Sequence, residues 1–305
     1  MPLLSPIALF VFKRPEHTAR LLSSLLKNVE FSQSPLFIYC DGARRNGESK
    51  HVADVRQMVK SFPHPYKTVI LAPANQGLAK SITQGVSELC ERFGRVIVVE
   101  DDLVVAPNFL HYMNGSLERY ADEPRVMQIS GHMFPVDLQV KTDAVFMPVA
   151  TSWGWATWQR AWEHMQVAPE LALEKLGSPR WRYQFDLQGS FPYARMLAER
   201  LAGRNHSWAI WWYFSMFINN GIALFPTRSL VINEGFDGSG THCGYKEIAF
   251  TALDGVRVAD FPDVGIDQPA FRTYCKFLQQ DRGFAKRNFD RLWRVFFSTR
   301  FCHVA

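Results

Sequence analysis

The stretch RVIVVEDD at residues 95–102 decides the fold. Its apolar run at residues 96–99 predicts a strand buried on both faces, as strands are in parallel sheets. Three acids, Glu100, Asp101 and Asp102, follow this strand without a gap. Carboxylates placed so close repel one another unless a cation or hydrogen-bond donors compensate them. The stretch therefore predicts a buried strand that ends in a charged site.

Strand and helix patterns alternate around this stretch. Strands are predicted at residues 6–12, 36–40, 68–71 and 95–99, and helices at 15–28, 52–62, after 77 and after 107. This alternation is typical of an α/β fold with a mostly parallel, doubly wound sheet flanked by helices. Ligands of such sheets bind at the carboxyl ends of the strands. The sequence places Arg14, Asp41, Asn75 and the acidic run at those ends.

The acidic run is a candidate metal site. Mg²⁺ and Mn²⁺ prefer oxygen ligands and leave room for substrate phosphates. A divalent cation that bridges diphosphate oxygens would offset the repulsion and stabilise a departing nucleoside diphosphate. The alternative is a solvated strand end with a helix-capping aspartate.

The pattern changes after residue 125. A strand is expected at 126–130, and an aromatic turn at 151–158 is expected to lead into a helix. Further helices are expected at 190–201 and 207–218. Short strands at 222–225 and 229–232 precede a glycine-rich loop at 235–244. Aromatic residues crowd this half of the chain, which suggests either a sugar-binding floor or a bulky core.

Two segments carry a family resemblance. Residues 75–79 (NQGLA) and 96–102 (VIVVEDD) resemble the nucleotide-sugar half of GT-A glycosyltransferases. VEDDLVVAPNF at 99–109 is similar to N-acetylglucosaminyltransferase I, and the whole resembles bacterial family-2-like sugar transferases. The resemblance covers about residues 6–243. It implies a GT-A domain at 1–245, with a nucleotide-binding half (1–125) and a donor-sugar and acceptor half (126–245), and a C-terminal helical extension at 246–305.

The resemblance also implies roles for single residues. Asp102 and His242 would bind the metal, and Asp101 the ribose or the metal shell. The other implied positions line the nucleotide or the sugar: Phe12, Arg14, Asp41, Asn75, Gly77, Gly154 and Trp155.

Several of these residues have a plainer interpretation. Asp41 precedes Gly42 and would serve as a turn residue, and Arg14 would pair with an acid. Gly77 would permit a tight turn. Trp155 would belong to an aromatic core rather than to a sugar site. The sequence leaves both interpretations open for each.

The acceptor side lacks its expected base. An inverting transferase needs a carboxylate that deprotonates the acceptor hydroxyl. In the similar enzymes this acid lies after the tryptophan turn, where this chain reads SWAIWW at residues 207–212. The substitutes are Asp237 and Glu234, with Asp237 preferred because it lies close to His242.

Charge and cysteine usage narrow the partners. The net charge is +5 and the sequence pI about 9.0, which fits an anionic partner such as a nucleotide, while no nucleic-acid module is recognisable. Five widely spaced cysteines without a C-x-x-C pair predict reduced thiols and a cytoplasmic protein, and no signal peptide is recognisable. Basic and aromatic residues alternate at 279–300, which favours either peripheral contact with an anionic membrane or a helix packed back on the domain.

The sequence thus predicts a metal-dependent glycosyltransferase acting on a nucleotide sugar, a UDP-sugar by preference, with a glycan or a lipid-linked molecule as acceptor and a hexosyl or N-acetylhexosaminyl group as cargo. Two rivals stay open. A sugar nucleotidyltransferase would share the acidic site, although residues 12–16 lack the glycine-rich phosphate loop. A non-catalytic nucleotide- or glycan-binding module would account for the missing base.

Overall fold

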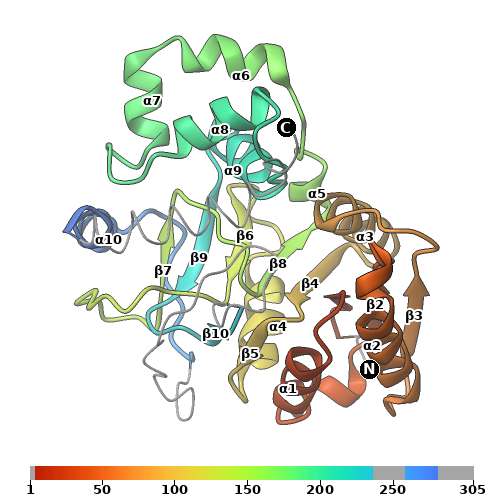
Figure 1. Ribbon diagram of the computed structural model, residues 1–305. Coiled ribbons are helices and arrows are strands. Elements are labelled where there is room, and N and C mark those ends of the chain that lie inside the picture. The colour runs from red at the N-terminus through yellow and green to blue at the C-terminus, as the bar shows by residue number, and fades with distance from the viewer. Residues whose placement is uncertain (1–3, 236–257, 281–305) are drawn as a thin grey trace, which may run out of the picture.

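A computed structural model describes residues 4–235 and 258–280 of the chain. Its centre is an eight-stranded sheet in the order β3-β2-β1-β4-β8-β6-β9-β7 (Figure 1). Its strands are β1 (Ile7–Val11), β2 (Leu36–Cys40), β3 (Lys67–Leu71), β4 (Arg95–Glu100), β6 (Val126–Ser130), β7 (Ala144–Met147), β8 (Trp155–Trp158) and β9 (Ile222–Pro226). Strands β8 and β7 run antiparallel to their neighbours, and the other pairs are parallel. The expected α/β class with a mostly parallel sheet is confirmed.

Helices flank the sheet. The chain forms α1 (Pro15–Leu25), α2 (Ser49–Ser61), α3 (Leu78–Phe93), α4 (Phe109–Arg119), α5 (Gln159–Trp162), α6 (Pro169–Leu176), α7 (Pro179–Phe185), α8 (Tyr193–Leu201), α9 (Ala209–Ile218) and α10 (Gln268–Gln280). Short 3-10 turns lie at Phe31–Gln33 and Asn46–Glu48. Helix α3 could be predicted from the sequence because its buried residues Ile82, Val86 and Leu89 recur at helical spacing.

The sheet order creates a topological switch between β1 and β4. The chain moves outward from β1 to β2 and β3, and then returns to pair β4 with the other side of β1. Right-handed crossovers put α1 and α2 on one face, and the reversal puts α3 on the other. The two loops that leave β1 and β4 therefore diverge at the carboxyl ends of these strands, where open α/β sheets bind their ligands in a crevice.

The tryptophan turn is shorter than expected, because its last four residues form a strand. Residues 155–158 are β8, whose main chain pairs with β4 and β6, and the helix expected after the turn, α5, begins at Gln159. The sequence WATW carries the β-favouring aromatic and β-branched residues of a buried strand. The sequence analysis also missed β7 and β5 (Leu103–Val105). The short strand expected at 229–232 corresponds to β10 (Val231–Asn233), which pairs with β5 in a small second sheet.

The described part of the expected C-terminal extension packs on the sheet. Phe146 of β7 forms a parallel bridge with Ile266, and the Tyr120 hydroxyl donates to the Pro262 carbonyl at 2.7 Å. In α10, Phe271 and Tyr274 are buried in the same core as the strands, and Figure 1 shows this helix beside β7. The boundary at residue 245 falls outside the described residues and stays a prediction.

No helix in residues 4–235 or 258–280 combines the length and the apolar character needed to cross a bilayer. Three cysteines, Cys40, Cys90 and Cys275, are buried free thiols. The basic and aromatic tail lies almost entirely outside the described ranges, so the expected membrane contact stays a prediction.

Candidate active site

The acidic run lies at the β1–β4 switch. Glu100 ends β4 opposite Phe10 of β1, and the main-chain amide of Asp101 donates to the Phe10 carbonyl at 3.0 Å. Arg14 lies just after β1 and directly before α1. The switch therefore brings Arg14 and the three acids together, although 85 residues of chain and more separate them in the sequence.

Arg14 ties two of the acids to the end of β1. Its Nη2 donates to Asp101 Oδ1 at 2.5 Å and to Asp102 Oδ2 at 3.1 Å. The main-chain amide of Phe12 donates to the second Asp101 oxygen at 3.1 Å. Asp101 is buried, and each of its oxygens accepts one hydrogen bond, so it acts as an internal latch between β1 and β4. These contacts match the plainer interpretation of Arg14, pairing with an acid, and the ribose or metal contact of Asp101 stays a prediction.

The pKa values of Arg14 and Glu100 reflect the crowding of negative charge at this site. Burial lowers the pKa of Arg14, but the charges of Asp101 and Asp102 outweigh it and raise that pKa above its ordinary value. Burial, followed by the charges of Asp102 and Asp101, raises the pKa of Glu100 well above its ordinary value. A bound cation would offset this crowded negative charge.

The segment after β10 closes on Asp102. The amide of Glu234 donates to the Asp102 carbonyl at 2.8 Å. Gly235 lies so close that a Cβ there would come within 2.5 Å of Asp102 Oδ2 and 3.2 Å of Arg14 Nη1. Only a residue without a side chain leaves the Asp102 carboxylate where it is.

Asp102 is the acid best placed to hold a divalent cation. Among the described residues only Arg14 donates to its carboxylate, which leaves one oxygen for another ligand. Within residues 4–235 and 258–280, no three His, Cys, Asp or Glu side chains are grouped so as to hold a metal ion. Magnesium-like ions are commonly held by one or two carboxylates together with water and substrate phosphates. One free Asp102 oxygen in a crowded negative site fits that pattern.

Asp41 organises the loop before α3. Its Oδ1 accepts from the amides of Gly42 and Gln76, each at 2.8 Å. Its Oδ2 accepts from Asn75 Nδ2 at 2.8 Å and from the Gly77 amide at 3.0 Å. Four donors fill the lone-pair positions of a carboxylate. The contacts therefore favour the turn interpretation of Asp41 over recognition of a base.

Asn75 and Gly77 share this loop. Asn75 Nδ2 also donates to the Gly42 carbonyl at 2.8 Å, so its amide group is turned toward the protein. Gly77 has a φ of 80° and precedes α3, a conformation that favours glycine. Both residues therefore shape this loop before α3.

The tryptophan turn contradicts one sequence-based expectation. Trp155 is fully buried and packs against Trp162, Trp208 and Trp212, with ring centroids 5.2–6.3 Å apart. Its ring belongs to the core and does not reach a sugar. Gly154 has a φ of 61° and lies close to Val231 of β10. A Cβ at this position would lie 2.9 Å from Val231 Cγ1, which leaves room only for glycine.

The expected acceptor-side residues are placed only in part. Asp237 and His242 lie outside the described residues, so both assignments stay predictions. Glu234 is described, and its carboxylate pairs with Arg20 Nε. Its use as a base would require that ion pair to open.

Two residues escaped the sequence analysis. Gly235 was read only as the start of a glycine-rich loop, although its hydrogen side chain sets the space around Asp102. His132 is buried behind the tryptophan turn, where its ring lies 4.4 Å from that of Trp153. Neither belongs to a recognisable motif, and only the three-dimensional neighbours reveal them.

No protein-family model and no curated protein matches the sequence. Among solved structures, the chain is similar to GalNAc-T7 with UDP, GalNAc and Mn²⁺, at 9% identity and a TM-score of 0.44, over 75% of this chain and 44% of that one. It is also similar to the mannosyltransferase PcManGT from Pyrobaculum calidifontis in complex with GDP-Man and Mn²⁺, at 12% identity and a TM-score of 0.40, over 72% and 70% of the two chains. Mouse xyloside xylosyltransferase 1 in its apo form gives 14% identity and a TM-score of 0.35, over 70% and 80%.

The chain thus spans less than half the length of GalNAc-T7. The similarity to these sugar transferases lies in the α/β fold. With TM-scores of 0.44 and lower, it leaves the function to be argued from the site itself.

Proposed function

We propose that the chain is a divalent-metal-dependent glycosyltransferase that uses a nucleotide sugar, a UDP-sugar by preference, and a glycan or lipid-linked acceptor. The observation that carries the proposal is the position of Asp102. It follows β4 at the topological switch and keeps one carboxylate oxygen available beside Arg14 and Gly235. An acid with a free oxygen in this crevice is suited to a cation that accompanies a diphosphate.

Each described residue has a physical task in this proposal. Asp102 would hold Mn²⁺ or Mg²⁺, which when bound offsets charge on the departing diphosphate. Arg14 fixes the Asp102 carboxylate and holds Asp101 as the latch between β1 and β4. The loop held by Asp41 forms the wall of the crevice next to β2. Gly235 keeps the space beside Asp102 open.

The acceptor half of the reaction rests on sequence alone. Asp237 remains the proposed base, from its position close to His242, and His242 remains the proposed second metal ligand, as the resemblance to GT-A glycosyltransferases implies. Glu234 is the reserve base, since opening its pair with Arg20 would free a carboxylate one residue from Gly235.

A binding experiment tests the metal assignment. Titration calorimetry with UDP, with and without Mn²⁺, is done on the wild type, Asp102→Asn and Asp54→Asn. Asp54 is an exposed acid on α2 and serves as the matched control. We expect Mn²⁺ to raise UDP affinity at least tenfold in the wild type and in Asp54→Asn, and not in Asp102→Asn. If Mn²⁺ leaves UDP affinity of the wild type unchanged, the proposal is wrong.

A donor screen tests catalysis. Release of the nucleoside diphosphate is measured across UDP-, GDP- and dTDP-sugars with Mn²⁺, with water or a glycan mixture as acceptor. Release of the nucleoside diphosphate from only one class of nucleotide sugar would identify the donor. Formation of a nucleotide sugar from a sugar phosphate and a nucleoside triphosphate would instead support the nucleotidyltransferase, and binding without any turnover would support the non-catalytic module.

A further inference from the structure

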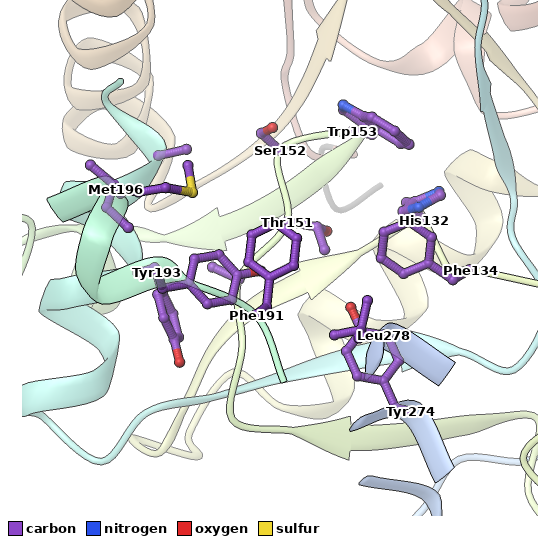
Figure 2. A pocket seen from close by; sticks show the side chains of 14 residues that line it. His132, Phe134, Thr151, Ser152, Trp153, Phe191, Tyr193, Met196, Tyr274 and Leu278 are labelled. Carbon is purple, nitrogen blue, oxygen red and sulfur yellow. The ribbon is translucent and has the colours of Figure 1, made fainter. Parts of the chain in front are cut away.

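Two cavities in the described part of the chain lie away from the acidic run and differ in size. The pocket in Figure 2 lies among His132, Trp153 and Phe191, and its volume is about 90 Å³. An engineered cavity that holds one benzene ring measures about 150 Å³, so this pocket is too small for a ring. The other cavity is a groove of about 780 Å³ between strand β3 and helix α3. Neither Arg14 nor the acidic run lines the groove, so the inference does not depend on the proposed function.

Strand β3 forms an open edge of the sheet beside this groove. Among the described residues β3 pairs only with β2, and Figure 1 shows it at the rim of the molecule. The Leu36 amide of β2 donates to the Tyr66 carbonyl at 2.9 Å, at the start of β3. Alternate residues of a parallel strand bond to the same neighbour. Lys67, Val69 and Leu71 therefore direct their main-chain amides and carbonyls outward.

The edge of β3 is apolar. Native sheets commonly protect an open edge with charged side chains, a proline or a bulge. The one charged residue of β3 is Lys67, whose ammonium donates to the carbonyls of Val59 and Lys60 at the end of α2, at 2.9 and 2.8 Å. The other four residues of the strand are threonine, valine, isoleucine and leucine. Such an edge is suited to pairing with another strand.

An exposed tyrosine lies at the amino end of this edge. Side chains of alternate strand residues lie on the same face of a sheet, so Tyr66 shares its face with Ile70. Ile70 is the register partner of Tyr39, and both residues line the groove. Tyr66 is 61% exposed. The groove continues past the carboxyl end of β3, where Ala72 and Pro73 form part of its wall.

Two copies of this edge complement one another in an antiparallel register. When Val69 lies opposite the partner's Val69 on a two-fold axis, Lys67 lies opposite the partner's Leu71, and every outward amide and carbonyl of β3 finds a partner. Any other antiparallel register leaves an outward residue unpaired. In the same register Tyr66 lies opposite the partner's Ala72, a small residue at the wall of the partner's groove.

The contact is large enough for a specific dimer. A tyrosine buries about 150–250 Å² when it is fully packed, and each copy contributes one ring and one groove. Together with the paired edges, the buried surface is on the order of 1,000 Å², which is the lower limit for a specific interface. Because the ammonium of Lys67 is held by α2, like charges do not oppose one another across the axis.

We propose that the chain forms a symmetric homodimer in which the β3 edges of two copies pair antiparallel and each Tyr66 enters the partner's groove between β3 and α3. The sheets of the two copies then continue into one another. Asp41 also lines the groove, so the interface adjoins the loop before α3 that Asp41 holds.

Sedimentation velocity over a concentration series tests the dimer on the full chain. We expect the wild type to be dimeric at about 100 μM and to dissociate on dilution. Tyr66→Ala should raise the dissociation constant at least about tenfold, because the ring is lost from both halves of the interface. Tyr183→Ala removes a tyrosine of similar exposure, 57%, from α7 and should dimerise as the wild type does. A wild type that is monomeric at about 100 μM would overturn the proposal.

A second pair of variants tests the strand pairing itself. The Val69 amide points away from β2, so Val69→Pro removes an outward donor and leaves the ladder with β2 intact. Val69→Thr keeps this amide and is the matched control. We expect Val69→Pro to be monomeric and Val69→Thr to dimerise, with folding of both checked by circular dichroism. If Val69→Pro does not fold, Tyr66→Ala decides alone, because its change lies on an exposed side chain. Wild-type dimer affinity in folded Tyr66→Ala or Val69→Pro would show that the copies meet through another surface.

Discussion

The guanidinium of Arg14 lies 2.5 Å from the buried carboxylate of Asp101 and joins the end of β1 to the end of β4. The same Nη2 reaches Asp102 at 3.1 Å. One side chain therefore closes the topological switch and positions the proposed metal ligand. Stability and function are coupled at this residue, and the variants below separate them.

Arg14→Met should destabilise the protein by about 3–5 kcal/mol, because it leaves Asp101 buried beside Asp102 without its cationic partner. The matched control is Arg92→Met, which removes an exposed pair with Glu88 on α3 and should cost less than about 1 kcal/mol. Urea unfolding of both variants measures the difference. An Arg14→Met loss as small as that of Arg92→Met would show that the latch contributes little to stability.

Gly235→Ala should weaken Mn²⁺-dependent UDP binding at least tenfold while changing stability by less than about 1 kcal/mol. The new Cβ would meet the end of a side chain, Asp102 Oδ2, so the carboxylate is displaced while the backbone stays unstrained. Gly47→Ala is the control, since a Cβ there meets nothing within 4 Å. Calorimetry and thermal unfolding separate the two effects, and wild-type UDP affinity in Gly235→Ala would remove Asp102 as the ligand that Gly235 protects.

Asp41→Ala should cost about 2–4 kcal/mol, because the loop at residues 75–77 loses the carboxylate that accepts from its two amides and from Asn75. Amide hydrogen exchange should rise at Gln76 and Gly77 and stay unchanged in β4. If stability and exchange are unaffected while the preference for UDP over other nucleotides disappears, Asp41 reads the base instead.

His132 should make the protein less stable in mild acid. Its folded pKa of about 3 lies below the ordinary 6.5, so below pH 6.5 the unfolded chain binds the extra proton and stability falls as pH falls. Between pH 7 and 4.5 this loss is about 2–3 kcal/mol. The difference in unfolding free energy between these two pH values should be smaller in His132→Phe by that amount. Equal pH dependence of the variant and the wild type would mean that His132 is protonated in the folded protein.

The first half of the fold was predicted well from the sequence, because strands β1 to β4 are continuous apolar runs and helices α1 to α3 have apolar residues at helical spacing. It placed Arg14, Asp41 and the acids at the carboxyl ends of strands correctly, because a strand's end can be read from where its apolar run stops. It failed at residues 155–158, where a turn was expected and the chain forms a buried strand. A segment of four uniformly buried residues is too short for its periodicity to identify a strand.

The sequence by itself thus determined the mostly parallel α/β class, the acidic strand end and the crowding of carboxylates there, because burial pattern and charge are local properties. The tertiary structure alone decided what each side chain touches. It placed Asp101 as the latch between β1 and β4 and made Asp41 the acceptor that holds the loop before α3. It also placed the Trp155 ring in the core and paired His132 with Ser229, 97 residues further along the chain. The physical reason is that a carboxylate or imidazole acts through the donors, acceptors and charges around it, and chain topology sets these neighbours at separations that no local pattern records.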